Sequence, residues 1–105
     1  MRFTSYLEDK KLTVALTGEI DHHCAKDYIG AILSKIEIYC PRICVLDFRE
    51  VNFMDSSGIA VAINAMRSMQ KIGGKLILEG LKQQPLKVIL ASGIDKLIEI
   101  REVLV

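Results

Sequence analysis

The chain alternates short apolar segments with single stretches of helical periodicity, and this order restricts the folds open to it. Apolar residues occupy successive positions at 43–46 and again at 76–78, as in strands that are buried on both faces. Helical stretches, in which apolar residues recur every three or four positions, separate these strands. Strand–helix–strand units of this kind give parallel strands joined by right-handed crossovers. The sequence therefore predicts an α/β fold.

The beginning of the chain departs from that order. Leu12, Val14 and Leu16 alternate with smaller or polar residues, which is the period of a strand with one buried face. The polar stretch 8–11 separates this strand from a weaker one at 3–7 and has the composition of a turn. We therefore expect an antiparallel first pair followed by parallel strands, a mixed β-sheet with helices packed against it.

The remaining elements follow from the same periodicities. Asp21 is the expected cap of a first helix that stops before Pro41, and a second helix is expected to run from Gly58 to Gly73-Gly74. The pattern further predicts a helix over 85–91 and a last strand over 97–101, and it leaves the tail 102–105 unassigned. Both faces of the strand at 43–46 are expected to be covered by helices or by further protein.

Composition excludes several classes of function. The 105 residues suit one domain spanning 1–105, and 14 Lys and Arg against 13 Asp and Glu give a net charge of only +1, so no nucleic-acid partner is expected. Apolar runs fall short of the roughly 18 residues that cross a bilayer, and the N-terminus does not resemble a secretion signal. We therefore expect a cytoplasmic protein without a membrane partner. Cys24, Cys40 and Cys44 form an odd set without a CxxC pair, which indicates neither a disulfide framework nor a zinc site.

The segment Asp55-Ser56-Ser57-Gly58 lies between an apolar strand and an amphipathic helix. A helix needs one N-cap, yet each of the first three residues could accept hydrogen bonds from the amides of the first turn. If Asp55 is the cap, Met54 would pack on Ile59 as a hydrophobic staple. The surplus hydroxyl of Ser56 would then face other proteins at the positive end of the helix, where a phosphate is tolerated.

Catalytic and metal-binding interpretations of these residues are weaker. A nucleophilic Ser56 would need a nearby base, and His22 and His23 open a different helix without an evident third partner. Consecutive residues such as His22, His23 and Cys24 splay apart around a helix start, which disfavours joint metal coordination. Gly73-Gly74-Lys75 precedes a strand, whereas a phosphate-binding loop precedes a helix. We therefore expect no enzyme activity, no metal and no cofactor.

Three segments together resemble a known family: 18–23, 53–59 and 73–76. At these separations the chain is similar to bacterial anti-sigma factor antagonists of the STAS domain family, and most similar to the sporulation type. The likeness extends over nearly the whole chain and implies a single STAS-like domain. The Asp-Ser-Ser-Gly segment is specific to the family, while the other two segments would be weak alone.

The resemblance implies a partner and a modification. The phosphorylated serine of the family maps to Ser56, and the modifying enzyme would be an anti-sigma factor that is itself an ATP-dependent serine kinase. Unphosphorylated protein would bind this kinase and release the sigma factor, and a serine phosphatase would restore the active form. The implied partner-binding residues are Asp21, His22, His23, Asp55, Ser56, Ser57, Gly58 and Ile59.

Other roles remain open on the sequence. The same domain could be a scaffold in a stress-signalling complex, or a sensor of a nucleotide or small ligand. Ala60 and Asp95 depart from residues common in the family, as does the segment 64–67, so the partner anti-sigma factor, the sigma factor and the choice between sporulation and general stress stay unassigned.

Overall fold

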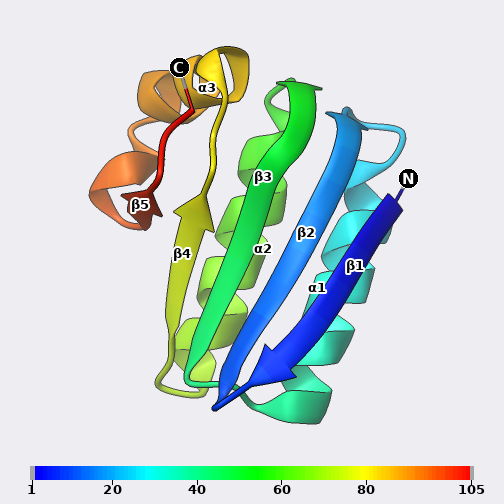
Figure 1. Cartoon of the computed structure of the whole chain (residues 1–105), viewed down its shortest axis with the longest axis vertical. Coiled ribbons are helices and arrows are strands. Elements are labelled where there is room, and N and C mark those ends of the chain that lie inside the picture. The colour runs from blue at the N-terminus through cyan, green and yellow to red at the C-terminus, as the bar shows by residue number, and fades with distance from the viewer. Residues whose placement is uncertain (1, 105) are drawn as a thin grey trace.

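A computed structural model describes residues 2–104 of the chain. Its elements follow one another as strands and helices in near-regular alternation after a first hairpin (Figure 1). They are β1 (Arg2–Glu8), β2 (Lys11–Ile20), α1 (Ala25–Tyr39), β3 (Ile43–Met54), α2 (Ser57–Lys71), β4 (Lys75–Glu79), α3 (Gln83–Ser92), the 3-10 helix η1 (Ile94–Lys96) and β5 (Glu99–Arg101).

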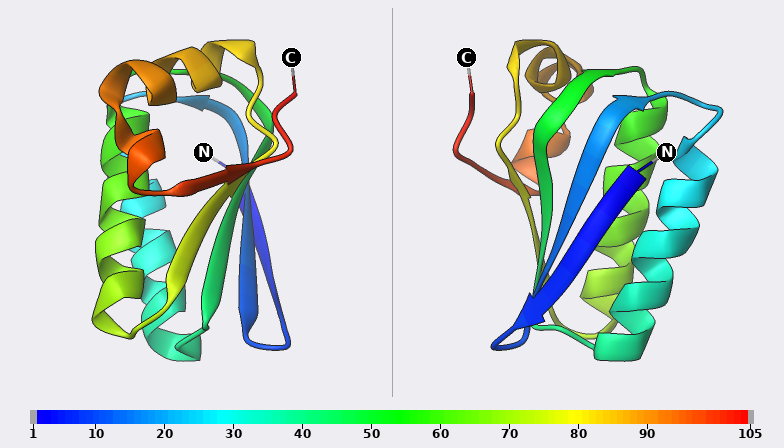
Figure 2. Two further views of the ribbon diagram at one scale, coloured as in Figure 1. Left: turned by 90° about the vertical axis from the view of Figure 1, so that its left-hand side faces the viewer. Right: turned by 45° about the vertical axis from the view of Figure 1, so that its right-hand side comes forward.

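The strands form one mixed sheet in the order β1-β2-β3-β4-β5. β1 and β2 are antiparallel and every later neighbouring pair is parallel, which confirms the predicted mixed sheet. Each parallel strand is added beside the previous one, and right-handed crossovers then place their helices on the same side. Figures 1 and 2 show α1 and α2 behind the sheet, with α3 over its upper end on that side.

The opening hairpin turns within two residues. Asp9 and Lys10 both have positive φ, of 49° and 63°, and Glu8 pairs directly with Lys11. Two residues with positive φ form the turn type that matches the right-handed twist of the strands it joins. The predicted turn at 8–11 is confirmed, and it places β1 at one edge of the sheet.

The core lies between the helices and the sheet. Leu12, Cys44 and Leu76 share one row of the register on the helix side and are buried, and burial raises the pKa of the Cys44 thiol to about 12. Tyr28 is fully buried on α1, and its hydroxyl donates a hydrogen bond of 2.9 Å to the carbonyl of Thr17. Each large apolar side chain buried here contributes about 1.5–3 kcal/mol. This core fixes the direction of α2 and thus the position of its first turn.

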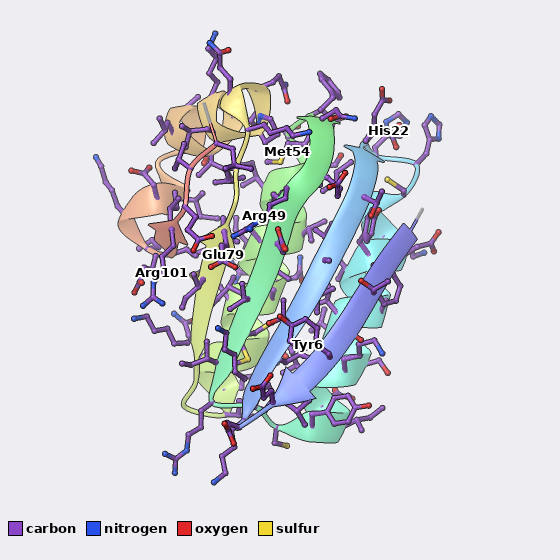
Figure 3. The ribbon with its side chains drawn as sticks, in the orientation of Figure 1. Tyr6, His22, Arg49, Met54, Glu79 and Arg101 are labelled. Carbon is purple, nitrogen blue, oxygen red and sulfur yellow. The ribbon has the colours of Figure 1, made fainter. Side chains whose placement is uncertain are left out.

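Among residues 2–104, no helix covers the opposite face of the sheet, contrary to one interpretation of the apolar run at 43–46. Thr13, Val45 and Ile77 are neighbours across three strands on this face. They are nevertheless only 5%, 2% and 1% exposed to solvent. Tyr6 lies beside Thr13 in the register, and Figure 3 shows Tyr6, Arg49 and Glu79 spread over this face (Figure 3). Neighbouring side chains therefore cover the centre of the face in place of a second helix layer.

The chain after β4 differs in detail from the prediction. The helix expected at 85–91 spans Gln83–Ser92. The strand expected at 97–101 is shorter than predicted, because only Glu99–Arg101 form β5, and the 3-10 helix η1 precedes it at Ile94–Lys96. The unassigned tail runs beside the segment after β4, where the amide of Leu104 donates a hydrogen bond of 2.7 Å to the carbonyl of Leu81. Among residues 2–104, no helix is long and apolar enough to cross a membrane.

Candidate functional site

Two loops lie side by side at the carboxyl ends of β2 and β3. The last residues of these strands, Ile20 and Met54, are partners in the parallel register. Immediately beyond them, the amide of Asp55 donates a hydrogen bond of 3.1 Å to the carbonyl of Ile20. The structure thus brings the β2–α1 loop, residues 21–24, next to the β3–α2 loop, residues 55–56. The carboxyl edge of an α/β sheet is where binding sites are commonly built.

The β3–α2 loop is shaped by the Asp55 carboxylate. Its Oδ1 accepts a hydrogen bond of 2.7 Å from the amide of Ser57, the first residue of α2. The next two amides, of Gly58 and Ile59, bond to the carbonyls of Asp55 at 3.0 Å and of Ser56 at 3.1 Å. The aspartate therefore does the side-chain capping, and the hydroxyl of Ser56, which stands at the N-cap position, is not used as a cap.

Ser56 is exposed, and its hydroxyl makes no hydrogen bond to any residue between 2 and 104. It precedes α2 directly, at the positive end of a helix of 15 residues. The amides of the first turn already have partners in the Asp55 side chain and in the loop backbone. The hydroxyl is thus available to another molecule without breaking an existing contact.

Gly58 explains how the loop packs onto the core. A Cβ at this position would lie 2.8 Å from both Cε and Sδ of Met54, a fully buried side chain. The side chain of Met54 thus packs against the backbone of Gly58, and the predicted staple from Met54 to Ile59 stays a prediction. Only a residue without a side chain lets the last residue of β3 and the first turn of α2 approach so closely.

Asp21 makes an equivalent turn in the β2–α1 loop. Its Oδ1 accepts hydrogen bonds from the amides of His23 at 2.9 Å and Cys24 at 3.3 Å. Desolvation acts to raise the pKa of Asp21, but these two amides, together with the side chains of Cys24 and His23, hold the pKa below its ordinary value. Asp21 was expected to cap α1 itself; instead it caps the turn at 22–24, and α1 begins only at Ala25.

His22 and His23 are exposed on that turn, with ring centroids 3.9 Å apart. No hydrogen bond joins either ring to Ser56 within the described part of the chain. Across the same residues, no cluster of three His, Cys, Asp or Glu side chains is arranged to hold a metal ion. The two histidines and Ser56 are all exposed at the carboxyl ends of the strands.

One contributor to the site has no signal in the sequence. Gln84, in the first turn of α3, accepts a hydrogen bond of 2.9 Å from the amide of Met54 and donates one of 3.0 Å to its carbonyl. β4 ends at Glu79, so no strand reaches this part of β3 from that side. The amide side chain pairs with the backbone as a neighbouring strand would. Gln84 therefore holds the residue that precedes Asp55.

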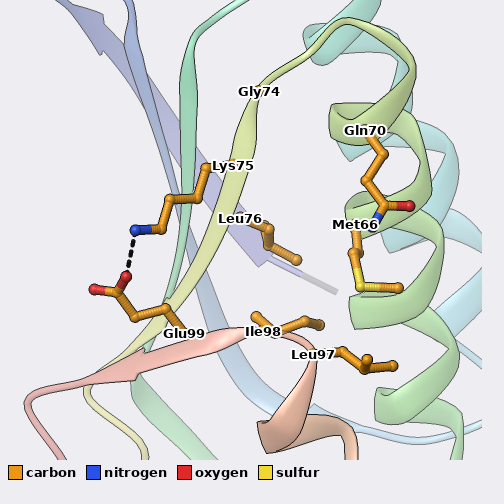
Figure 4. Close-up of a pocket in the computed structure, with 8 residues that line it drawn as sticks. All are labelled: Met66, Gln70, Gly74, Lys75, Leu76, Leu97, Ile98 and Glu99. Atoms are coloured by element: carbon orange, nitrogen blue, oxygen red, sulfur yellow. Dashed lines mark ion pairs between the residues drawn. The ribbon is translucent and has the colours of Figure 1, made fainter.

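Two hollows of the surface lie away from the two loops. One, of about 160 Å³, lies between the C-terminal half of α2 and the edge of β4, where Lys75 forms an ion pair with Glu99 (Figure 4). The other, of about 290 Å³, lies at the hairpin beside Tyr6 and Ile43. Neither of these two hollows is lined by a residue of the two loops.

Comparison with known proteins gives this surface a context. The family model described as "STAS domain" matches residues 5–105. A Bacillus subtilis protein described as "Anti-sigma-B factor antagonist" is 29% identical over 93 residues, which cover 88% of this chain and 83% of the relative. A Lysinibacillus sphaericus protein described as "Anti-sigma F factor antagonist" is 28% identical over 83 residues, which cover 79% of this chain and 71% of the relative.

Solved structures share the fold. The phosphorylated form of SpoIIAA, described as a Bacillus cell fate determinant, superposes with a TM-score of 0.73 at 25% identity, covering 94% of this chain and 90% of that one. A protein from Thermotoga maritima, described as a putative anti-sigma factor antagonist, superposes with a TM-score of 0.86 at 17% identity, covering 96% and 86%. The order of strands and helices is therefore one already seen in experimental structures.

Proposed function

Since the chain belongs to the STAS domain family, we propose that it is an anti-sigma factor antagonist controlled by phosphorylation of Ser56. In its unmodified form it binds an anti-sigma factor that is a serine kinase, and this binding releases the sigma factor. The kinase transfers a phosphoryl group from ATP to Ser56, after which the complex separates. A serine phosphatase removes the group, and the protein has no catalytic activity of its own.

One observation carries the proposal: the Ser56 hydroxyl is exposed, unbonded and placed at the start of a firmly packed helix. A phosphoacceptor requires only this, because the kinase supplies the base, the metal ion and the nucleotide. The names of the relatives, antagonists of anti-sigma-B and anti-sigma F factors, support the same role. The phosphorylated form described for SpoIIAA supports a switch of this chemical kind.

Electrostatics explains why the modified form would release its partner. Phosphate on Ser56 adds about −1.5 to −2 charges beside the carboxylate of Asp55. A partner surface that is acidic or tightly packed would be repelled or would have to desolvate a dianion. A thousandfold loss of affinity corresponds to only about 4 kcal/mol, which one dianion in an interface can supply.

The contact surface includes both loops. We place the kinase against Asp21, His22 and His23 on one loop, and against 55–59 on the other. Phe53 adds an apolar element, because this last but one residue of β3 remains 42% exposed. Large aromatic side chains are frequent anchors in protein interfaces.

The test is phosphorylation of the whole chain by its kinase-type anti-sigma factor with ATP and magnesium. Intact-mass measurement should show one added phosphoryl group on the wild type and on Ser57→Ala, and none on Ser56→Ala. Calorimetry should show that Ser56→Ala still binds the kinase, which separates loss of the acceptor from loss of the fold. A phosphoryl group on Ser57, or an unmodified wild type, would contradict the proposal.

A further inference from the structure

The two edges of the sheet are built differently. β5 closes one edge with only three residues, two of them the charged Glu99 and Arg101. β1 closes the other edge with seven residues and contains neither Lys, Pro nor Gly. Short, charged or covered edges are the usual protection against pairing with another chain. The β1 edge is longer and carries charge only at its two ends, Arg2 and Glu8, and Figure 1 shows no other element beside it.

The hairpin turn determines which backbone groups of β1 face outward. Glu8 and Lys11 close a two-residue turn and therefore form a hydrogen-bonded pair. Because hydrogen bonding alternates along an antiparallel pair, Thr4 and Tyr6 bond to β2 as Glu8 does. The N–H and C=O groups of Phe3, Ser5 and Leu7 point away from the sheet. No strand within residues 2–104 receives them.

We propose that β1 pairs antiparallel with β1 of a second copy of this chain, about a two-fold axis at Ser5. This register sets Arg2 opposite Glu8 of the second copy, Phe3 opposite its Leu7 and Thr4 opposite its Tyr6. Opposite charges meet at both ends, and apolar residues meet on the helix side of the sheet. The strand Arg-Phe-Thr-Ser-Tyr-Leu-Glu is thus complementary to its own reverse.

The register follows from geometry as well as charge. Outward-facing residues alternate, so Phe3, Ser5 and Leu7 must pair with the same three positions of the second copy. The pairing centred on Ser5 is the one in which all three are bonded and all seven residues overlap. It joins the two sheets into one continuous sheet, an arrangement in which the same surface is used by both copies.

Exposed apolar groups along this edge would be covered by such pairing. Tyr6 is 59% exposed and Leu7 is 44% exposed. Behind β1, the amine of Lys35 lies 5.8 Å from the centre of the Phe3 ring, and Ile38, one helical turn further on the same face of α1, is 70% exposed. On the helix side, the second copy brings its own Phe3 and α1 towards Leu7 and Ile38, and on the other face its Thr4 lies beside Tyr6.

The Ser56 loop stays free in this dimer. It follows β3, and β2 lies between β3 and the paired edge. The proposed kinase contact at 21–23 and 53–59 and the proposed dimer contact at 2–8 therefore share no residue. Either proposal can fail without the other.

Sedimentation equilibrium of the whole chain, at concentrations up to about 1 mM, tests the pairing. We expect a reversible dimer whose dissociation constant rises at least about tenfold in Arg2→Glu or Glu8→Arg, because each creates two pairs of like charges. The double variant Arg2→Glu/Glu8→Arg restores opposite charges at the same net charge, so its dimer should match the wild type. A monomeric wild type, or a double variant no better than the single ones, would overturn the proposal.

Ser5→Pro gives an independent readout. Its N–H faces away from β2, so the substitution removes a bond across the dimer and none within the monomer. We expect a folded monomer, verified by an unchanged cooperative thermal transition. Amide exchange at Phe3, Ser5 and Leu7 should also slow as wild-type concentration increases. Dimers that persist in Ser5→Pro, or exchange at these amides that ignores concentration, would place the contact elsewhere.

Discussion

Two strand–loop–helix units of this protein use the same backbone device. Asp21 and Asp55 each follow a strand directly and accept a hydrogen bond from the amide two residues later, at 2.9 Å and 2.7 Å. The residue between is His22 in one unit and Ser56 in the other. α2 begins two residues after its aspartate, whereas α1 begins four residues after. The same turn thus places Ser56 at a helix start and His22 a turn away from one.

The two loops also differ in how they are held. Gln84 bonds to both backbone groups of Met54, and Met54 packs on Gly58. In the β2–α1 loop, the thiol of Cys24 donates a weaker hydrogen bond of 3.3 Å to the carbonyl of Glu19. A group that must be presented reproducibly to an enzyme gains from the first arrangement. The two loops share the same turn. Ser56 differs from His22 in its position at a helix start and in the contacts that hold its loop in place.

Placing the same negative charge in each loop tests this distinction most strongly. Ser56→Asp should weaken binding to the kinase-type anti-sigma factor about a hundredfold, since a carboxylate carries less charge than phosphate. His22→Asp should weaken it about tenfold or less, because the charge lies at the margin of the proposed contact. Isothermal titration calorimetry measures both constants. Equal affinities for Ser56→Asp and the wild type would contradict the switch, and equal losses in both variants would remove the distinction between the loops.

Removing the clamp should loosen one loop alone. Gln84→Ala leaves the amide and carbonyl of Met54 without their partners, and we expect a loss of about 2 kcal/mol in the free energy of unfolding. Gln83→Ala is the matched control, since Gln83 is exposed and makes no hydrogen bond within the described residues. Urea unfolding gives the two free energies, and amide exchange should increase at Asp55 and Ser56 but not at His22. Equal stabilities for both variants would show that the clamp is dispensable.

A methyl group added to each helix separates the two packings. Gly30→Ala in α1 meets no atom within 4 Å and should stabilise the fold by about 0.5–1 kcal/mol through helix propensity. Gly58→Ala in α2 gains the same propensity but forces Met54 aside, and we expect a net loss of about 1 kcal/mol. Thermal and urea unfolding measure both changes. A stabilised Gly58→Ala would mean that Met54 repacks without cost.

Acid should affect the Asp21 turn with a definite sign. Its folded pKa lies below the unfolded value of about 3.9, so its contribution is present above that value and is lost as pH falls through the folded pKa. The stability difference between the wild type and Asp21→Asn should therefore shrink below about pH 4. Urea unfolding of both variants across this pH range measures the stability difference. The contributions of the other acidic residues are the same in both variants and cancel in the difference. A difference that stays constant down to the folded pKa would contradict the role of the two amides.

The sequence predicted the fold well where side-chain periodicity determines it. The alternation of Leu12, Val14 and Leu16 and the apolar run after Ile43 gave the mixed sheet, because strand and helix periods are local properties. The position of the helices on a single face depends on strand order, which no local pattern contains. For the same reason, Val45 could be predicted as buried but not as covered by side chains alone.

The site was predicted in its chemistry more than in its bonding. The segment 55–58 contains three candidate caps. Only the three-dimensional structure shows that the Asp55 carboxylate is the one that caps the helix. Gln84 lies 30 residues from Met54 in the chain, and a glutamine at this position is typical of the exposed surface of any helix. The contact between Gln84 and Met54 depends on where β4 ends, which is a property of the tertiary structure. Contacts of this kind have no periodic signature to detect.

The occupied amides at the start of α2 have a consequence for how information leaves this molecule. The amides of Ser57, Gly58 and Ile59 already have partners, so a phosphate on Ser56 could bond to them only by displacing those partners. The phosphate would change the electrostatic potential of the surface around Ser56, and only a molecule that contacts this surface would respond to the change. Such a signal acts at once, demands no refolding, and is erased completely when the ester is hydrolysed.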